Sequence, residues 1–111
     1  MDQRQVDLLF HALADTTRRD IVTRTMTDDY SVSALARCYE MSFAAVQKHV
    51  AVLERATLVT KHPHGREQLV RANPETIRTA NGLLEELETL WRHRIDRIGE
   101  ILAQADTGED K

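Results

Sequence analysis

Cysteine is nearly absent from this chain of 111 residues. Cys38 is the single one, so an internal disulfide is impossible and a reducing compartment fits the composition. The sequence also lacks a run of about 18 apolar residues, which is the length that a membrane-spanning helix needs. Its first residues, M-D-Q-R-Q-V-D, lack the basic start and apolar centre of a secretory signal. We therefore expect a cytoplasmic protein that has no membrane partner.

Signatures of catalysis and of metal binding are missing as well. There is no Ser-His-Asp or Cys-His constellation, no Gly-rich phosphate loop and no carboxylate pair at a recognisable spacing, so we expect no enzyme. A zinc site takes about three or four ligands, and no such spacing joins the six candidates, which are His11, Cys38, His49, His62, His64 and His93. His62 and His64 could share one face of a strand, but P-H-G there is typical of a turn. We expect no metal and no cofactor. Cys38 is interpreted as a partly buried small apolar residue in preference to a redox sensor.

Excess positive charge is absent from the chain as a whole but present in its middle. The net charge is −3, and residues 1–41 and 73–111 are both acidic. Residues 42–72 carry a net charge of +3, from Lys48, Arg55, Lys61, Arg66 and Arg71 against Glu54 and Glu67. A local basic region of this kind is what a phosphate-binding surface requires.

Residues 42–58, in the same basic region, form the segment around which the chain is organised. Ser42 suits a helix N-cap, and Val46, Val50 and Leu53 follow at the spacing of one buried helix face. The opposite face is small, with a few polar tips, and consists of Phe43, Ala44, Gln47, Lys48 and Ala51. A helix that enters a DNA groove needs little bulk and a few hydrogen-bonding side chains. We predict a recognition helix.

The neighbouring segments complete a helix-turn-helix and a wing. Helices are predicted over residues 6–14 and from about 15 to 26, and a short third one over 34–41 precedes the recognition helix. The helix-turn-helix therefore covers about residues 32–56, although its turn, Y-E-M-S, lacks the glycine often found there. Two strands around P-H-G-R predict a β-hairpin over about residues 58–72. Its tip carries His62, His64 and Arg66, which suits a wing that lies against a phosphate backbone.

A long helix is predicted after the hairpin, over about residues 74–105, followed by a polar tail at 106–111. It begins at N-P-E, which is a capping residue, a proline and an acid. Its apolar stripe recurs every three or four residues and needs a partner. A homodimer is the favoured partner, and the alternative is a stripe that folds back within a monomer. The residues that we assign to the dimer interface are Leu9, Leu84, Leu87, Trp91, Ile95 and Ile98.

Four motifs, in order, resemble the ArsR-type winged helix-turn-helix transcriptional regulators. They are F-H-A-L-A-D-T-T-R-R-D-I-V at 10–22, S-V-S-A-L-A at 31–36, M-S-F-A-A-V-Q-K-H-V-A-V-L-E-R-A-T-L-V at 41–59 and G-R-E-Q-L-V at 65–70. The chain lacks the family's Cys-x-Cys metal motif, and it departs from the pattern at Thr16, Asp20 and Thr57. The resemblance implies a mainly α fold with a small β-hairpin, in a single domain over residues 1–105. It also implies a dimeric repressor that binds an imperfect inverted repeat in double-stranded DNA.

Residue roles follow from this reading. Gln47 and Lys48, with Phe43 and Ala44 on the same face, are expected at base edges. Ser42, His49 and Arg66 are expected at phosphates, with His62 and His64 of the wing nearby. His49 has a second interpretation, as a brace against a neighbouring helix. The alternative function is that of a winged-helix module that binds proteins in place of DNA. The sequence does not indicate which small-molecule effector, if any, the protein binds.

Overall fold

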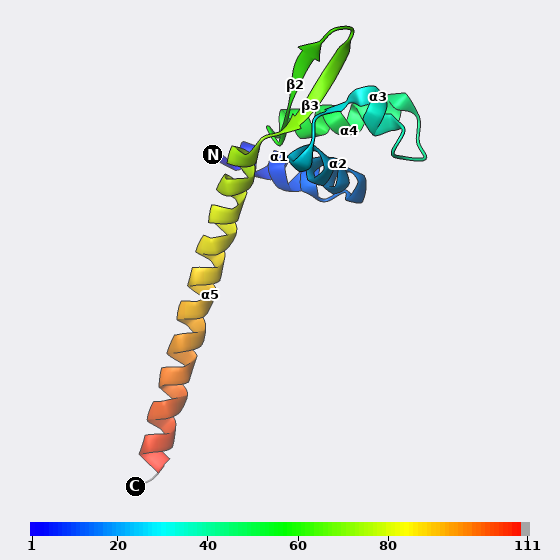
Figure 1. Ribbon diagram of the computed structural model, residues 1–111. Coiled ribbons are helices and arrows are strands. Elements are labelled where there is room, and N and C mark those ends of the chain that lie inside the picture. Colours follow the sequence, from blue (N-terminus) through cyan, green and yellow to red (C-terminus); the bar gives the residue numbers. More distant parts are fainter. Residues whose placement is uncertain (110–111) are drawn as a thin grey trace. The chain divides into compact units, whose positions relative to one another are not determined.

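Helices and one small sheet make up the computed structural model, which describes the backbone of residues 1–109 and the side chains of residues 1–105 (Figure 1). The elements in chain order are α1 (Gln3–Leu13), α2 (Thr16–Thr27), β1 (Tyr30–Ser31), α3 (Val32–Ala36), α4 (Phe43–Arg55), β2 (Val59–His64), β3 (Glu67–Ala72) and α5 (Pro74–Glu109). The chain divides into two units, residues 1–80 and the part from residue 81 onward. The first unit has the predicted mainly α winged helix-turn-helix architecture.

The core of the first unit draws side chains from α1 to α4 and from the strands β2 and β3. Its largest buried side chains are Leu9, Ile21, Leu35, Val46, Val50, Leu53, Leu58, Val59 and Val70. The stripe Val46, Val50 and Leu53 lies where the sequence predicts it, on the inner face of α4. Burial of these apolar side chains supplies most of the folding free energy, at about 25 cal/mol per Å².

Two neighbouring arginines close the C-terminus of α1. The Arg18 Nε donates to the Ala12 carbonyl at 2.8 Å and its Nη2 to the His11 carbonyl at 3.1 Å. The Arg19 Nη1 donates to the Leu13 carbonyl at 2.8 Å. The last carbonyls of a helix have no partner within it, so these bonds explain two arginines in the first turn of α2, where the helix dipole disfavours positive charge.

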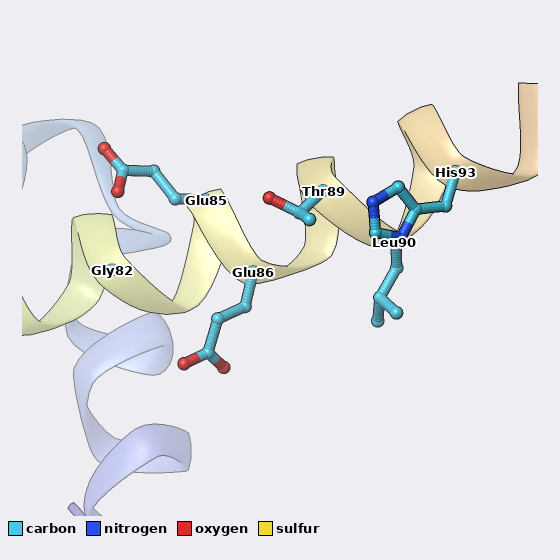
Figure 2. A pocket seen from close by; sticks show the side chains of 6 residues that line it. All are labelled: Gly82, Glu85, Glu86, Thr89, Leu90 and His93. Carbon is cyan, nitrogen blue, oxygen red and sulfur yellow. The ribbon is translucent and has the colours of Figure 1, made fainter. Parts of the chain in front are cut away.

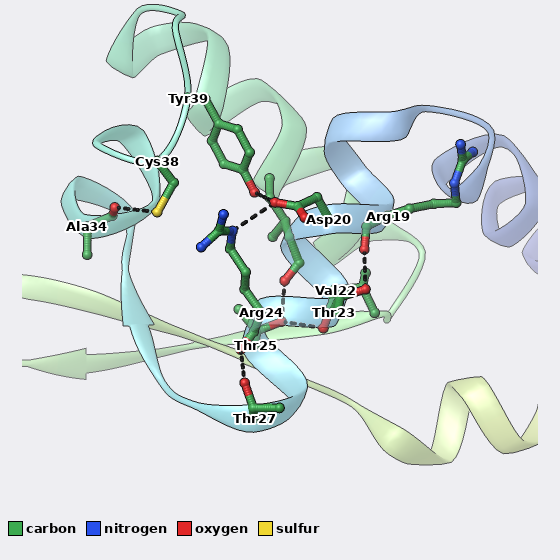
Figure 3. Close-up of polar contacts among 11 residues, drawn as sticks. Arg19, Asp20, Val22, Thr23, Arg24, Thr25, Thr27, Ala34, Cys38 and Tyr39 are labelled. Carbon is green, nitrogen blue, oxygen red and sulfur yellow. Dashed lines mark hydrogen bonds and ion pairs between the residues drawn. The ribbon is translucent and has the colours of Figure 1, made fainter.

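Helix α3 is shorter than predicted, and a longer connection follows it. It ends at Ala36, whereas the sequence predicts a helix up to about residue 41. Tyr39 is the physical reason, because its side chain packs against the core and its hydroxyl donates to Asp20 Oδ2 of α2 at 2.5 Å (Figure 3). Arg24 Nε donates to the same oxygen at 2.8 Å. These tertiary contacts outweigh the local helix preference of the segment.

The wing is a three-stranded antiparallel sheet rather than a hairpin alone. Its strand order is β1-β3-β2, and β1 pairs Tyr30 with Val70. The sequence indicates only a turn at the position of β1, because two residues are too few to show an alternating pattern. The β2–β3 turn pairs His64 with Glu67 and places Gly65 at a φ of 64°. Glycine adopts that conformation without steric penalty.

Thr57, one of the positions at which the sequence departs from the pattern of the family it resembles, ends α4. It lies at a φ of 57°, which a β-branched residue rarely adopts. Its N–H donates to Glu54 O and that of Leu58 to Leu53 O, both at 3.0 Å, which is the Schellman pattern of helix ends. The buried Thr76 of α5 donates its hydroxyl to Thr57 O at 2.7 Å. The helix therefore ends with the backbone conformation that a glycine would adopt there, and Thr57 bears backbone strain that a glycine would not have.

Two apolar side chains of the first two helices are exposed, and one predicted burial differs in the structure. Phe10 of α1 and Met26 of α2 are 40% and 43% exposed. The side chain buried in α2 near Met26 is Thr25, whose hydroxyl donates to Ile21 O at 2.8 Å and so has its polar group satisfied. Cys38 is exposed rather than partly buried, because α3 ends before it and it lies in the connection to α4.

The second unit consists of α5 from Asn81 onward. The helix continues to Glu109, beyond the end predicted near residue 105, and the last two residues of the predicted tail, 110–111, lie outside the described residues. Pairs one turn apart support it locally, such as Arg92 Nε to Glu88 Oε1 at 2.9 Å. No helix in the described part of the chain is long and apolar enough to cross a membrane.

Candidate DNA-binding surface

The outer face of α4 is exposed and chemically free. Phe43, Ala44, Gln47 and Lys48 are all exposed. The side chains of Gln47 and Lys48 form no hydrogen bond or ion pair with any residue that the structure describes. Their amide and ammonium groups are therefore available to a ligand.

Ser42 is committed in part to the helix itself. Its Oγ accepts the Ala45 N–H at 3.1 Å, which caps the N-terminus of α4. A serine hydroxyl also has one O–H to donate, and the N-terminus of a helix carries a partial positive charge. Ser42 can therefore cap the helix and still donate to an anion, as a phosphate contact requires.

The wing and the recognition helix meet at one shallow hollow of about 210 Å³. Phe43 and Gln47 line it from α4, and Arg66 and Glu67 line it from the wing, with Ser33 of α3 beside them. Arg66 is exposed, and its guanidinium has no ion pair within the described residues. Three of the predicted DNA contacts, from two separate motifs, thus lie on one surface.

The other wing residues extend this surface with mixed charge. His62 Nε2 lies 2.8 Å from Thr60 Oγ1, and His64 is exposed near the turn. Lys61 reaches back to Glu54 at the end of α4, with 3.7 Å between Nζ and Oε1. This pair links the recognition helix to the wing, and its exposure makes it weak, at roughly 0–1 kcal/mol.

Arg71 attaches the wing to the loop after α2. Its Nη2 lies 2.9 Å from Asp29 Oδ2, and its Nε lies 3.0 Å from both carboxylate oxygens. The bond to Arg71 holds the pKa of Asp29 below its usual range. Because Arg71 is paired, it neutralises Asp29 and leaves less positive charge for DNA than the sequence count suggests.

His49 lies at the side of α4 and contacts α2. Its Nδ1 lies 3.3 Å from Arg18 Nη1 and 3.9 Å from Asp15 Oδ2, and its side chain is 22% exposed. The interpretation of His49 as a brace therefore has contacts behind it. Sequence reasoning missed the role of Arg18, although its position in the first turn of α2, against the helix dipole, was the available signal.

The residues predicted for the dimer interface divide between the two units. Leu9 is wholly buried in the core of the first unit, so its side chain presents no surface to a second chain. The five that lie on α5 are between 47% and 63% exposed, and they are Leu84, Leu87, Trp91, Ile95 and Ile98. Leu90, Ile101 and Leu102 widen this exposed apolar stripe. Apolar surface on this scale is typical of an interaction site.

A hollow of about 650 Å³ also lies along α5, and only residues of that helix line it (Figure 2). Its polar side chains include Glu85, Glu86 and His93. Figure 2 shows the side chains of Glu85, Glu86 and His93 projecting in different directions, so the two carboxylates do not converge with the imidazole. We interpret this hollow as open helix surface and not as a ligand cavity.

Side chains that could bind a metal do not gather at one place in the described part of the chain. No group of three or more His, Cys, Asp or Glu side chains in the described part of the chain is placed to hold a metal ion. Cys38 has no second cysteine beside it, and its Sγ donates to the Ala34 carbonyl at 3.4 Å (Figure 3). A thiol in this contact alone cannot form a closed thiolate site.

Comparison with known proteins agrees with this geometry, although no protein-family model matches the chain. The chain is 31% identical to the HTH-type transcriptional regulator Rv2034 of Mycobacterium tuberculosis over 99 residues. These matched residues make up 89% of this chain and 90% of that protein. The solved structure of an ArsR-like transcriptional regulator from Rhodococcus sp. RHA1 has a TM-score of 0.84 and 31% identity, and covers 91% of this chain and 93% of that one.

A second solved structure shows the same fold at lower identity. The solution structure of the homodimeric winged helix-turn-helix DNA-binding domain Mb0332 from Mycobacterium bovis has a TM-score of 0.64 and 21% identity, and covers 77% of this chain and 80% of that one. The fold and the exposed α4 surface define a winged helix-turn-helix protein. This chain belongs to the ArsR family of transcriptional regulators, which is a family of regulators and not of enzymes.

Proposed function

We propose that this protein is a homodimeric repressor that binds an inverted-repeat operator in double-stranded DNA, in the cytoplasm. The observation that carries the proposal is the free outer face of α4, where the side chains of Gln47 and Lys48 are exposed and have no partner among the described residues, and where Gln47 shares a hollow with Arg66 of the wing. In this arrangement Gln47 and Lys48 contact base edges, with Phe43 and Ala44 on the same face. Ser42, His49 and Arg66 hold phosphates, with His62 and His64 of the wing nearby.

The dimer follows from the apolar stripe of α5. Leu84, Leu87, Trp91, Ile95 and Ile98 of two chains would bury one another, and a two-fold pair presents two copies of α4. Two recognition helices in successive major grooves read half-sites about 10 base pairs apart, or a multiple of that spacing. The homodimeric state described for the Mycobacterium bovis domain supports this assembly.

The test is a titration against DNA from upstream of the protein's own gene, with a scrambled duplex as control, at several salt concentrations. We expect specific binding that weakens steeply with salt, because phosphate contacts release counterions. We also expect Gln47→Ala and Lys48→Ala to abolish discrimination between the two duplexes while the dimer persists. A variant of either kind that keeps the wild-type preference would remove the groove assignment.

A winged-helix module that binds proteins is the competing function. The acidic segments on both sides of the basic region favour it, since net charge is −3 overall. Under that function the protein would bind both duplexes weakly and equally. The titration therefore separates the two, and a reporter gene placed behind the bound promoter distinguishes repression from activation.

A further inference from the structure

Phe43 is an exposed aromatic residue on the surface proposed to bind DNA. It is the first residue of α4, and 46% of its surface is open to solvent. Exposing a side chain that could bury 150 Å² or more is unfavourable without a partner. Of the groups that a base pair presents in the major groove, the C5-methyl of thymine is the apolar one. Phe43 therefore matches thymine in chemistry.

Gln47 lies one helical turn after Phe43 on the same face. Both line the hollow between α4 and the wing, so their side chains face the same space. The Gln47 amide has no partner among the described residues and offers a donor and an acceptor side by side. Adenine presents the complementary pair, an N7 acceptor and an N6 donor, whereas guanine presents two acceptors. The amide therefore favours adenine over guanine.

We propose that Phe43 and Gln47 together read A·T base pairs in each half-site, with Phe43 on a thymine methyl and Gln47 bidentate to adenine. The inference rests on the proposed function and adds the identity of the bases. Four helical residues advance about 6 Å along the axis, roughly two base-pair rises of 3.4 Å. The two side chains therefore read A·T pairs that are neighbours or next neighbours. Lys48, which carries donors only, does not share this preference.

The experiment replaces single bases in the natural operator with analogues. Each thymine in one half-site is exchanged for uracil, which removes only the methyl group, and each adenine for 7-deazaadenine, which removes the N7 acceptor. We expect one uracil and one 7-deazaadenine, no more than two pairs apart, each to weaken wild-type binding about fivefold or more. Exchanges elsewhere in the half-site should have smaller effects.

The protein variants assign each effect to its residue. Phe43→Ala should bind the thymine and uracil operators equally, while Phe43→Leu, which keeps an apolar contact, retains part of the difference. Gln47→Ala should bind the adenine and 7-deazaadenine operators equally. Thermal unfolding of each variant without DNA checks that the domain is folded.

The outcomes separate this inference from the proposed function. Tight binding of the natural operator with no sensitivity to either analogue overturns the base assignment and leaves the repressor intact. If a Phe43→Ala variant binds every duplex more weakly and still distinguishes the uracil operator from the thymine operator, Phe43 acts by packing against the wing. This result also overturns the base assignment. Absence of any preference for the natural operator removes the proposed function and the inference with it.

Discussion

Arg18 of α2 forms a hydrogen bond with His49 of α4, and its guanidinium also bonds to α1, so one side chain joins three helices. The Arg18 guanidinium lies 3.3 Å from His49 Nδ1 while two other nitrogens of the same group donate to the C-terminus of α1. A guanidinium can only donate, so His49 Nδ1 must accept, and a neutral imidazole then carries its proton on Nε2. The other ring nitrogen, His49 Nε2, has no partner among the described residues. Since none of their side-chain nitrogens or oxygens is both buried and unpaired, His49 Nε2 is open to solvent. His49 can thus brace α4 and still donate to a phosphate.

The first prediction concerns this tautomer. In a long-range ¹H–¹⁵N spectrum recorded at about pH 8, we expect wild-type His49 to carry its proton on Nε2. Arg18→Met should raise the share protonated on Nδ1, because Asp15, 3.9 Å away, is then the remaining charged neighbour. Arg19→Met is the control, since Arg19 caps α1 without touching His49. A wild-type ring protonated mainly on Nδ1 contradicts the assignment.

Thr57 gives a prediction about stability. An L-residue in the left-handed region costs roughly 1–2 kcal/mol, so Thr57→Gly should be more stable than Thr57→Ala by about 1 kcal/mol. Neither variant changes the Thr57 carbonyl that accepts from Thr76. The matched pair Lys48→Gly and Lys48→Ala, inside the same helix, should show the opposite order by about 1 kcal/mol. Urea unfolding measures all four, and the same order at both positions would refute the strain at Thr57.

Tyr39 gives a prediction that depends on pH. Its hydrogen bond, followed by that of Arg24, lowers the pKa of Asp20 below the ordinary 3.8. A lowered carboxyl pKa contributes stability above the unfolded value, and the contribution is lost as pH falls through the folded value. Tyr39→Phe should therefore cost about 1 kcal/mol at pH 7, which is a modest value because Asp20 is partly exposed.

At about pH 3 the same substitution should cost less, since Asp20 is then increasingly protonated in the unfolded chain. Chemical unfolding at both pH values measures the difference. Tyr39→Phe in an Asp20→Asn background is the control and should show little change with pH. A cost that is equal at both pH values in the wild-type background would mean that Tyr39 acts by packing alone.

The stripe on α5 gives a prediction about assembly. Leu87 is 63% exposed in the single chain, and Leu87→Asp would place a charge in the proposed interface, where an unpaired charge is strongly unfavourable. We expect the sedimentation mass to fall from dimer to monomer. Thr89→Asp adds the same charge outside the stripe and should leave the mass unchanged. If Leu87→Asp also sediments as the wild type does, the interface lies elsewhere.

Much of the fold was predictable because it depends on local patterns. The stripe Val46, Val50 and Leu53 and the cap Ser42 define α4 from within one segment, and both are present as predicted. The glycine of P-H-G-R likewise indicates the wing turn, and Gly65 occupies its positive-φ position. Periodicity and capping are read over a few residues, so a sequence displays them directly. The assignment of the outer face of α4 to DNA remains a prediction.

Contacts between segments that are distant in the sequence were decided by the tertiary structure alone. Tyr39 reaches Asp20 across 19 residues, His49 reaches Arg18 across 31, and Arg71 reaches Asp29 across 42. These contacts end α3 early, occupy Arg71 and fix which nitrogen of His49 is free. The sequence by itself determined a helix with a small outer face inside a basic segment. Which of its side chains are available to DNA depends on partners brought together by packing, because an ion pair or a buried position exists only once both segments have folded.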